Sequence, residues 1–254
     1  MTAPLAGRAV LVTRPAHQAA SLAQAIETAG GVAILFPALA IEAVPAAQLE
    51  AALAGLREAD AVIFISPNAA RFGMAAIGVL PAGARVFAVG PGTARALAQA
   101  GQPGCIVPAG QDSEALLALP ELARVDGQRI TLVRGVGGRP LLADTLKARG
   151  ADVRYVECYR RVRPEADAAP LLACWQAGGV DAVTVASAET LVNLMAMLGE
   201  TGPTLLAATP LFAPHEKIVA SARTLGLTHA VATAGGDAGL VEGLIRWFNP
   251  QTDR

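Results

Sequence analysis

The stretch Asp60-Ala-Val-Ile-Phe-Ile-Ser66 occurs again later in the chain as Asp181-Ala-Val-Thr-Val-Ala-Ser187. Each copy is a short apolar run that begins with aspartate and ends with serine, a composition typical of a strand buried on both faces of a parallel sheet. Similar runs alternate with alanine-rich helical stretches along the chain, as where Arg8–Thr13 precedes Ala16–Ala29. The pattern predicts an α/β protein with parallel sheets flanked by helices.

Three further pairs of segments repeat in the same order. Phe87-Ala88 matches Phe212-Ala213, Cys105–Val107 matches His229–Val231, and Arg8–Val12 matches Arg129–Val133. Four matches in one order predict an internal duplication that gives two similar domains. Proline and charge interrupt both copies after their second strand, at Pro37–Pro45 and Arg160–Ala169. These interruptions suggest that the chain crosses between the domains twice; a head-to-tail arrangement divided near Asp126 is the alternative.

Composition limits the classes of function. The 254 residues are 53% hydrophobic and 16% charged, enough apolar material for buried cores. A net charge of −1 without a Lys/Arg run argues against nucleic-acid binding. The apolar runs are too short to span a bilayer, and no secretory signal is recognisable. Three separated cysteines have no metal-ligand spacing and fit a reducing compartment, so we expect a soluble cytoplasmic protein.

Ligands of parallel α/β sheets bind at the carboxyl ends of strands. The predicted strands end at Thr13-Arg14-Pro15, Ser66-Pro67-Asn68, Gly90–Thr93, Arg134–Arg139, Ser187–Glu189 and Pro214–Lys217. Glycine-rich turns and helix starts expose backbone N–H groups, which suits a ligand with several carboxylates or phosphates. The glycine turns have neither the Walker spacing nor the dinucleotide-binding spacing.

Most candidates also have a structural interpretation, and for these the residues by themselves leave both interpretations open. The alternatives are N-caps worth about 1 kcal/mol for Ser66 and Ser187, a helix-start position for Thr93, turn formation for Gly137 and Gly138, solvated surface groups for His215 and Lys217, and interdomain packing for Tyr159. No Ser–His–Asp set, metal cluster or carboxylate pair stands out. An enzyme of this sequence would therefore use no metal, no cofactor and little acid–base machinery.

At these residues the chain resembles the uroporphyrinogen-III synthase family. The resemblance runs from about Arg8 to Leu244 and rests on Val12–Pro15 with Gln18, Ile65–Ala69, Ala88–Ala94, Gly135–Arg139, and Gly150–Val153 leading into Tyr159-Arg160-Arg161. It implies two α/β domains joined by a two-stranded linker, with substrate between them. The first domain would be discontinuous, residues 1–37 plus 164–254; the second would be residues 43–157, with linker strands at 38–42 and 158–163.

The resemblance also implies an activity. It implies a lyase of heme biosynthesis that removes water from hydroxymethylbilane, a linear tetrapyrrole, and closes it with inversion of the last pyrrole ring. Tyr159 is the candidate catalytic residue; the candidate substrate-binding residues are Arg14, Ser66, Gly92, Thr93, Gly137, Gly138, Arg139, Ser187, His215 and Lys217. His215 and Lys217 depart from the family, many members of which have a Gly-x-Thr type turn there. That both meet substrate carboxylates is our own hypothesis.

The expected protein is a cytoplasmic monomer that binds its small-molecule substrate and neither nucleic acid nor membrane. The main alternative function is a non-catalytic two-domain protein that binds a tetrapyrrole or another polyanion. A generic two-lobed binding protein would share the duplication, but it would normally carry an export signal.

Overall fold

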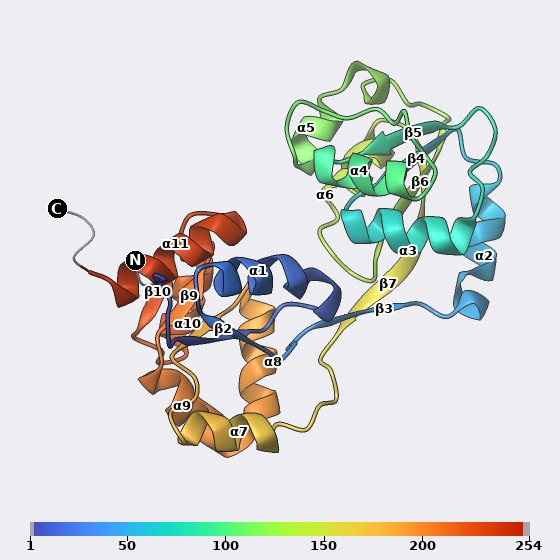
Figure 1. Cartoon of the computed structure of the whole chain (residues 1–254). Coiled ribbons are helices and arrows are strands. Elements are labelled where there is room, and N and C mark those ends of the chain that lie inside the picture. Colours follow the sequence, from blue (N-terminus) through green and yellow to red (C-terminus); the bar gives the residue numbers. More distant parts are fainter. Residues whose placement is uncertain (1–2, 251–254) are drawn as a thin grey trace. The chain divides into compact units, whose positions relative to one another are not determined.

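The computed structural model describes residues 3–250, which form two compact units (Figure 1). The first unit combines the described chain up to Ala40 with the described chain from Val162 onward, and the second is Ile41–Arg161. Each unit contains one five-stranded sheet with helices on both faces. The predicted α/β class, with parallel sheets flanked by helices, is confirmed.

The sheet of the first unit has the strand order β10-β9-β8-β1-β2, and all its neighbouring strands run parallel. Its strands are β1 (Ala9–Val12), β2 (Val32–Leu35), β8 (Ala182–Thr184), β9 (Leu211–Ala213) and β10 (Ala230–Ala232). Its helices are α1 (Ala16–Thr28), α7 (Ala169–Gln176), α8 (Ala188–Leu198), the 3-10 helix η2 (Gly199–Thr201), α9 (Gly202–Ala208), α10 (Glu216–Thr224) and α11 (Gly236–Phe248).

The sheet of the second unit has the order β3-β7-β6-β4-β5, in which β7, β6, β4 and β5 run parallel. Its strands are β3 (Ala40–Ala43), β4 (Ala61–Phe64), β5 (Arg85–Ala88), β6 (Arg129–Gly135) and β7 (Asp152–Val162). Its helices are α2 (Ala46–Leu56), α3 (Pro67–Ile77), α4 (Pro91–Gln99), α5 (Ser113–Leu117), the 3-10 helix η1 (Pro120–Leu122) and α6 (Leu141–Ala148).

The strands are apolar throughout because both faces of each sheet are covered. In β4, Val62 and Phe64 pack into one core with residues of α3 and α4. Ala61 and Ile63 point to the opposite face and pack with residues of α5 and α6. Alternate residues of a strand face opposite sides of the sheet, so a strand covered on both sides shows no polar alternation.

The duplicated segments occupy equivalent places in the two sheets. The copies beginning at Asp60 and Asp181 form β4 and β8, and these strands lie beside β5 and β9, which hold Phe87 and Phe212. The pair of Cys105–Val107 and His229–Val231 differs: the second copy forms β10, whereas the predicted strand at Cys105–Val107 is a single parallel bridge between Ile106 and Phe87. Prolines stand on both sides of that segment and lack the N–H that would extend a ladder.

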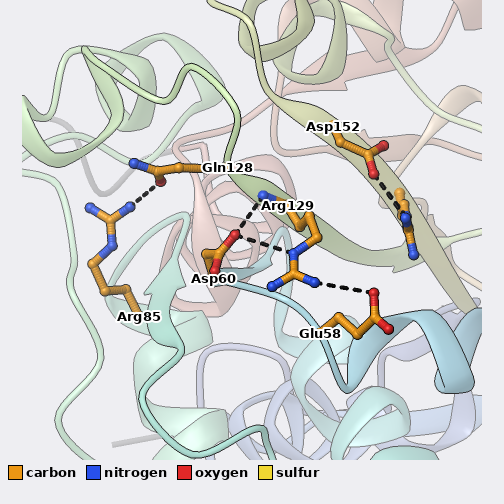
Figure 2. Close-up of polar contacts among 7 residues, drawn as sticks. Glu58, Asp60, Arg85, Gln128, Arg129 and Asp152 are labelled. Carbon is orange, nitrogen blue, oxygen red and sulfur yellow. Dashed lines mark hydrogen bonds and ion pairs between the residues drawn. The ribbon is translucent and has the colours of Figure 1, made fainter.

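Polar contacts connect the strands of the second unit at their amino ends (Figure 2). The Asp60 carboxylate accepts a hydrogen bond from the backbone N of Arg129 at 2.8 Å, and Arg129 Nη1 donates to Glu58 at 3.1 Å. Arg85 donates to Gln128 on the same side of the sheet. The amino ends of these strands are therefore occupied by structural ion pairs and hydrogen bonds.

One helical stretch, Ala188–Ala208, is long and apolar enough to cross a membrane by length and composition alone. It comprises α8, η2 and α9, and the sequence pattern did not reveal it because polar residues interrupt its apolar runs. Leu191, Leu194 and Leu198 of this stretch lie in the core of the first unit.

Candidate functional site

Tyr159 and Ser66, both predicted site residues, meet at the carboxyl edge of the second sheet. Tyr159 lies on β7 and is only 4% exposed, and its hydroxyl lies 3.1 Å from Ser66 Oγ. Ser66 follows β4 and is the N-cap of α3, because its Oγ also accepts a hydrogen bond from the backbone N of Ala69 at 3.0 Å. Ser66 is thus both a helix cap and the hydrogen-bond partner of the tyrosine.

Gly135, the last residue of β6, provides the space for the Tyr159 ring. It pairs with Tyr159 across the ladder at a register shift, and a Cβ on Gly135 would lie 2.6 Å from two ring carbons. Phe72 of α3 also packs against this ring, with centroids 5.8 Å apart. A larger residue than glycine at position 135 would therefore displace the candidate catalytic hydroxyl.

The predicted glycine turn follows directly after Gly135. Gly137 and Gly138 have φ angles of 77° and 104°, in the region that side-chain-bearing residues rarely adopt. The backbone N of Gly137 donates to the Glu157 carboxylate at 3.3 Å. Arg139, at the end of the turn, is 72% exposed and forms a 3.6 Å ion pair with Glu114.

Two charged residues beside this turn, Arg134 of β6 and Glu157 of β7, were not predicted as individual site residues. Arg134 is only 6% exposed, although it carries a guanidinium group, and its Nε lies 3.7 Å from the Glu157 carboxylate. Its guanidinium also stacks over the Tyr155 ring at 5.2 Å. The position of Arg134 at a strand end beside a glycine turn was visible in the sequence, but its burial was not.

The start of α4 holds the remaining predicted residues of this unit. Gly92 is half-buried and Thr93 is 2% exposed, on the side of α4 that packs toward the core. The backbone N of Thr93 donates to the Gly90 carbonyl at 3.1 Å. Thr93 therefore lies inside the first turn of the helix, whereas Gly92 reaches its surface.

The first unit carries an ion pair at the same edge of its sheet. Arg14, predicted as a site residue, donates to Asp237 in the first turn of α11. Partial burial raises the pKa of Asp237, but hydrogen bonds from Ser21 and Arg14 outweigh this effect and hold that pKa below its ordinary value. Asp237 was missed because 223 residues separate it from Arg14.

The other predicted residues of the first unit lie at the starts of α8 and α10. Ser187 is the N-cap of α8: its Oγ accepts from the backbone N of Thr190 at 3.0 Å and lies 2.8 Å from the Thr190 hydroxyl. His215 precedes α10 without making a side-chain cap, and both His215 and Lys217 are exposed. Each unit thus has its predicted residues near the carboxyl ends of its strands.

Cavities and possible metal ligands complete the description of the site. A groove of about 420 Å³ in the second unit is lined by residues that include Val136, Tyr155, Glu157 and Arg160. A pocket of about 530 Å³ lies between α2 and α3 and is lined by none of the predicted site residues. Among residues 3–250, no three His, Cys, Asp or Glu residues are grouped so that they could hold a metal ion.

These features define a two-unit α/β protein, built by duplication, with polar residues at the carboxyl edge of each parallel sheet. A family model described as "Uroporphyrinogen-III synthase HemD" matches residues 20–242. The chain is 38% identical over 197 residues to the uroporphyrinogen-III synthase of Escherichia coli, and the matched region covers 74% of this chain and 79% of that protein. It is 33% identical over 195 residues to a putative uroporphyrinogen-III synthase of Methanothermobacter thermautotrophicus, covering 74% and 77%. The chain belongs to the uroporphyrinogen-III synthase family.

Solved structures agree on the fold. A mutant uroporphyrinogen III synthase from Thermus thermophilus aligns with a TM-score of 0.63 at 23% identity, covering 96% of this chain and all of that one. The uroporphyrinogen-III synthetase of Helicobacter pylori aligns with a TM-score of 0.61 at 12% identity, covering 94% and 99%. The predicted family resemblance is confirmed, and the alternative of a non-catalytic binding protein is not favoured.

Proposed function

We propose that this protein is a uroporphyrinogen-III synthase, a lyase of heme biosynthesis that converts hydroxymethylbilane into uroporphyrinogen III. Family membership carries the proposal, through the model match over residues 20–242 and the 38% identity to a curated relative. The reaction removes water from the terminal hydroxymethyl group and closes the ring with inversion of the last pyrrole. It is the reaction that the sequence motifs implied.

In the proposed mechanism, Tyr159 assists departure of the substrate hydroxyl. Ser66 Oγ accepts a hydrogen bond from the backbone N of Ala69 and lies 3.1 Å from the Tyr159 oxygen, to which it would donate its own proton in this mechanism. The phenol proton of Tyr159 is then available to the leaving hydroxyl, which departs as water when the C–O bond breaks. The pyrrole nitrogen supplies the electrons, so the resulting cation is delocalised over the substrate itself.

The later steps require positioning more than acid–base chemistry. The substituted carbon of the last pyrrole attacks the new electrophile, and a spiro intermediate forms. The bond from that carbon to its original methylene bridge then breaks, the methylene bonds to the unsubstituted α-carbon of the same ring, and this carbon loses its proton. Holding the reacting carbons close together supplies several kcal/mol of the acceleration. The eight carboxylates of the substrate provide the points of attachment, and helix starts and basic side chains are suitable partners for them.

We assign the substrate-binding role to the predicted residues near the carboxyl edges of the two sheets. In the second unit these are Ser66, Gly92, Thr93, Gly137, Gly138 and Arg139, and in the first unit Arg14, Ser187, His215 and Lys217. The exposed residues would meet carboxylates directly, whereas Arg14 would do so while paired with Asp237. The protein would work as a cytoplasmic monomer without metal or cofactor, and it would bind neither nucleic acid nor membrane.

The domain organisation belongs to the same proposal. Residues 1–37 plus 164–254 would act as one domain and residues 43–157 as the other, with linker strands at 38–42 and 158–163. Both strands that join the units, β3 and β7, belong to the second sheet, where β7 lies between β3 and β6.

A coupled assay tests the function directly. Hydroxymethylbilane is supplied by its own synthase, and the III and I isomers of the cyclised product are separated after oxidation. We expect mostly the III isomer, at a rate proportional to the concentration of this protein. Only the I isomer, at the rate seen without the protein, would contradict the proposal. Binding of the product without formation of the III isomer would instead indicate the non-catalytic alternative.

A further inference from the structure

Arg134 is a charged side chain whose burial is not explained by the contacts that it makes. Its side chain is 8% exposed, yet its hydrogen bond and its ion pair both involve Nε. Nε donates to the Gly135 carbonyl at 3.2 Å and lies 3.7 Å from the Glu157 carboxylate. One face of the guanidinium stacks over Tyr155. The Nη1 and Nη2 groups, which carry four of its five N–H donors, have no acceptor among the described residues.

These free donors reach the surface. In the part of the chain that the structure describes, every fully buried side-chain nitrogen or oxygen has a hydrogen-bond partner. The Nη groups of Arg134 have none, so they are the part of this side chain that solvent contacts. Burying a guanidinium is costly unless its N–H groups are satisfied. The arrangement is that of a site completed by an external acceptor.

The glycine turn leaves room for such an acceptor. A Cβ on Gly138 would lie 2.5 Å from Arg134 Nη2, so any residue larger than glycine would cover this donor. Val136, Gly137 and Gly138 are exposed, and the groove of about 420 Å³ next to them is lined by Val136 and Glu157. The turn therefore passes close to the guanidinium without covering it.

We propose that the Nη edge of Arg134 binds a carboxylate of the substrate. This inference rests on the proposed function, since it assigns one of the acidic side chains of a polycarboxylate tetrapyrrole to this place. A guanidinium presents two parallel N–H groups that match the two oxygens of a carboxylate, and such charge-assisted pairs are the strong ones. Arg134 and Tyr159 lie on the neighbouring strands β6 and β7 near the carboxyl edge of the second sheet, so the bound carboxylate would hold the substrate at the edge that carries the candidate catalytic hydroxyl.

Glu157 then has a role opposite to that of a simple ion-pair partner. Its carboxylate competes electrostatically with an incoming carboxylate, while it holds the Gly137 backbone N at 3.3 Å. Glu157→Gln removes the competing charge and keeps an oxygen that accepts from Gly137. If Arg134 binds substrate, loss of this charge strengthens binding. If Arg134 serves only to hold Glu157 in place, loss of the Glu157 charge and loss of Arg134 should change KM in the same direction.

The experiment compares Arg134→Gln, Arg134→Lys and Glu157→Gln with the unaltered protein. We expect Arg134→Gln to raise the KM for hydroxymethylbilane by about tenfold to a hundredfold, the range for a lost hydrogen bond to a charged group. Arg134→Lys keeps the charge but loses the paired N–H donors, so its KM should lie between that of the unaltered protein and that of Arg134→Gln. Glu157→Gln should lower KM by about twofold to fivefold, as for an exposed charge pair. Arg154→Gln, an exposed arginine at the amino end of the same sheet, is the matched control and should leave KM unchanged.

Binding without turnover separates this inference from the proposed function. Uroporphyrinogen III, kept anaerobic, is titrated into each variant by calorimetry, and circular dichroism checks the fold. An unchanged affinity and KM for Arg134→Gln would overturn the assignment even if the unaltered protein makes the III isomer. A rise of KM in Glu157→Gln would also overturn the assignment. If Arg134→Gln does not fold, the KM values of Glu157→Gln and Arg134→Lys test the assignment in its place. Failure of the unaltered protein in the isomer assay would contradict the function alone.

Discussion

At the scale of single residues, the position of the Tyr159 side chain depends on two neighbouring side chains and on the absence of a side chain at Gly135. The Tyr159 hydroxyl shares a hydrogen bond with Ser66 Oγ, Phe72 packs on the Tyr159 ring, and Gly135 leaves the space that the ring occupies. Close packing of this kind in a protein interior holds a side chain in one rotamer. A phenol held in this way can act through its hydroxyl at little cost in entropy.

Removing that hydroxyl tests the role of Tyr159. We expect Tyr159→Phe to lower kcat by about a hundredfold or more, the contribution typical of a positioned proton donor. The ring stays packed, so Tm should change little. Ser66→Ala should lower kcat less and cost about 1 kcal/mol of stability through the lost N-cap. Isomer-resolved kinetics and thermal unfolding measure both effects, and an unaltered kcat in Tyr159→Phe would exclude the tyrosine from the chemistry.

At the scale of elements, the two copies agree at one pair of helix starts and differ at another. Ser66 and Ser187 cap α3 and α8 through equivalent bonds of 3.0 Å to the residue three positions on. The next helices, α4 and α10, begin after Gly90 and His215, and neither has a side-chain cap. The same fold thus presents a bare glycine turn in one unit and two basic side chains in the other.

The basic start of α10 provides the second prediction. The double variant His215→Ala/Lys217→Ala should raise KM several-fold at low salt and leave kcat nearly unchanged, because exposed charges contribute to binding about 0.2–1 kcal/mol each. The effect should shrink as salt screens the interaction. Arg246→Ala, an exposed arginine that pairs with Glu242 within α11, is the matched control. A KM equal to that of the unaltered protein at low salt would leave His215 and Lys217 as surface residues.

At the scale of the whole molecule, the two units repeat one polar connection at the amino edges of their sheets. Asp60 accepts from the backbone N of Arg129, and Asp181 accepts from the backbone N of Ala9, each at 2.8 Å. Each aspartate precedes a central strand and binds the start of the neighbouring strand. The duplication therefore preserved a structural connection at one edge of each sheet, while at the opposite edge the starts of α4 and α10 diverged.

The Asp60 connection predicts a pH dependence of stability. The backbone hydrogen bond from Arg129, followed by the Arg129 side chain, lowers the pKa of Asp60 below its ordinary value of 3.8. A carboxyl whose pKa is lower in the folded state stabilises the fold above its ordinary pKa and loses this contribution as pH falls through the folded-state value. Asp60→Asn should therefore lower Tm at pH 7.

The difference in Tm between the two proteins should disappear at pH values well below 3.8. Thermal unfolding followed by circular dichroism across this range is the measurement. Glu58→Gln is the control, because Glu58 is 61% exposed and contacts the same arginine. A difference that stays constant with pH would show that the charge of Asp60 contributes nothing.

The sequence by itself determined the class of fold, the duplication and the family. These follow from local patterns: four-residue apolar strands such as Ala61–Phe64, helices between them, and turns such as Gly135–Arg139 that keep their order along the chain. Such patterns are local because a strand covered on both faces has to be apolar at every position. The polar residues at the strand ends were also predictable, because ligands of parallel sheets bind at the carboxyl ends of the strands.

Only the tertiary structure decided which of these residues meet and which are buried. The bond between Ser66 and Tyr159 joins residues 93 positions apart, and the pair of Arg14 and Asp237 joins residues 223 apart. Nothing local marks Arg134 as buried, because the ring that lies over its guanidinium belongs to Tyr155 on the neighbouring strand. Ile106 makes one bridge instead of a strand because the prolines on either side of this segment lack the N–H groups that would extend the ladder, and this loss takes effect only when the sheet assembles. Local pattern specifies the elements, but contact between them depends on how the folded backbone brings their ends together.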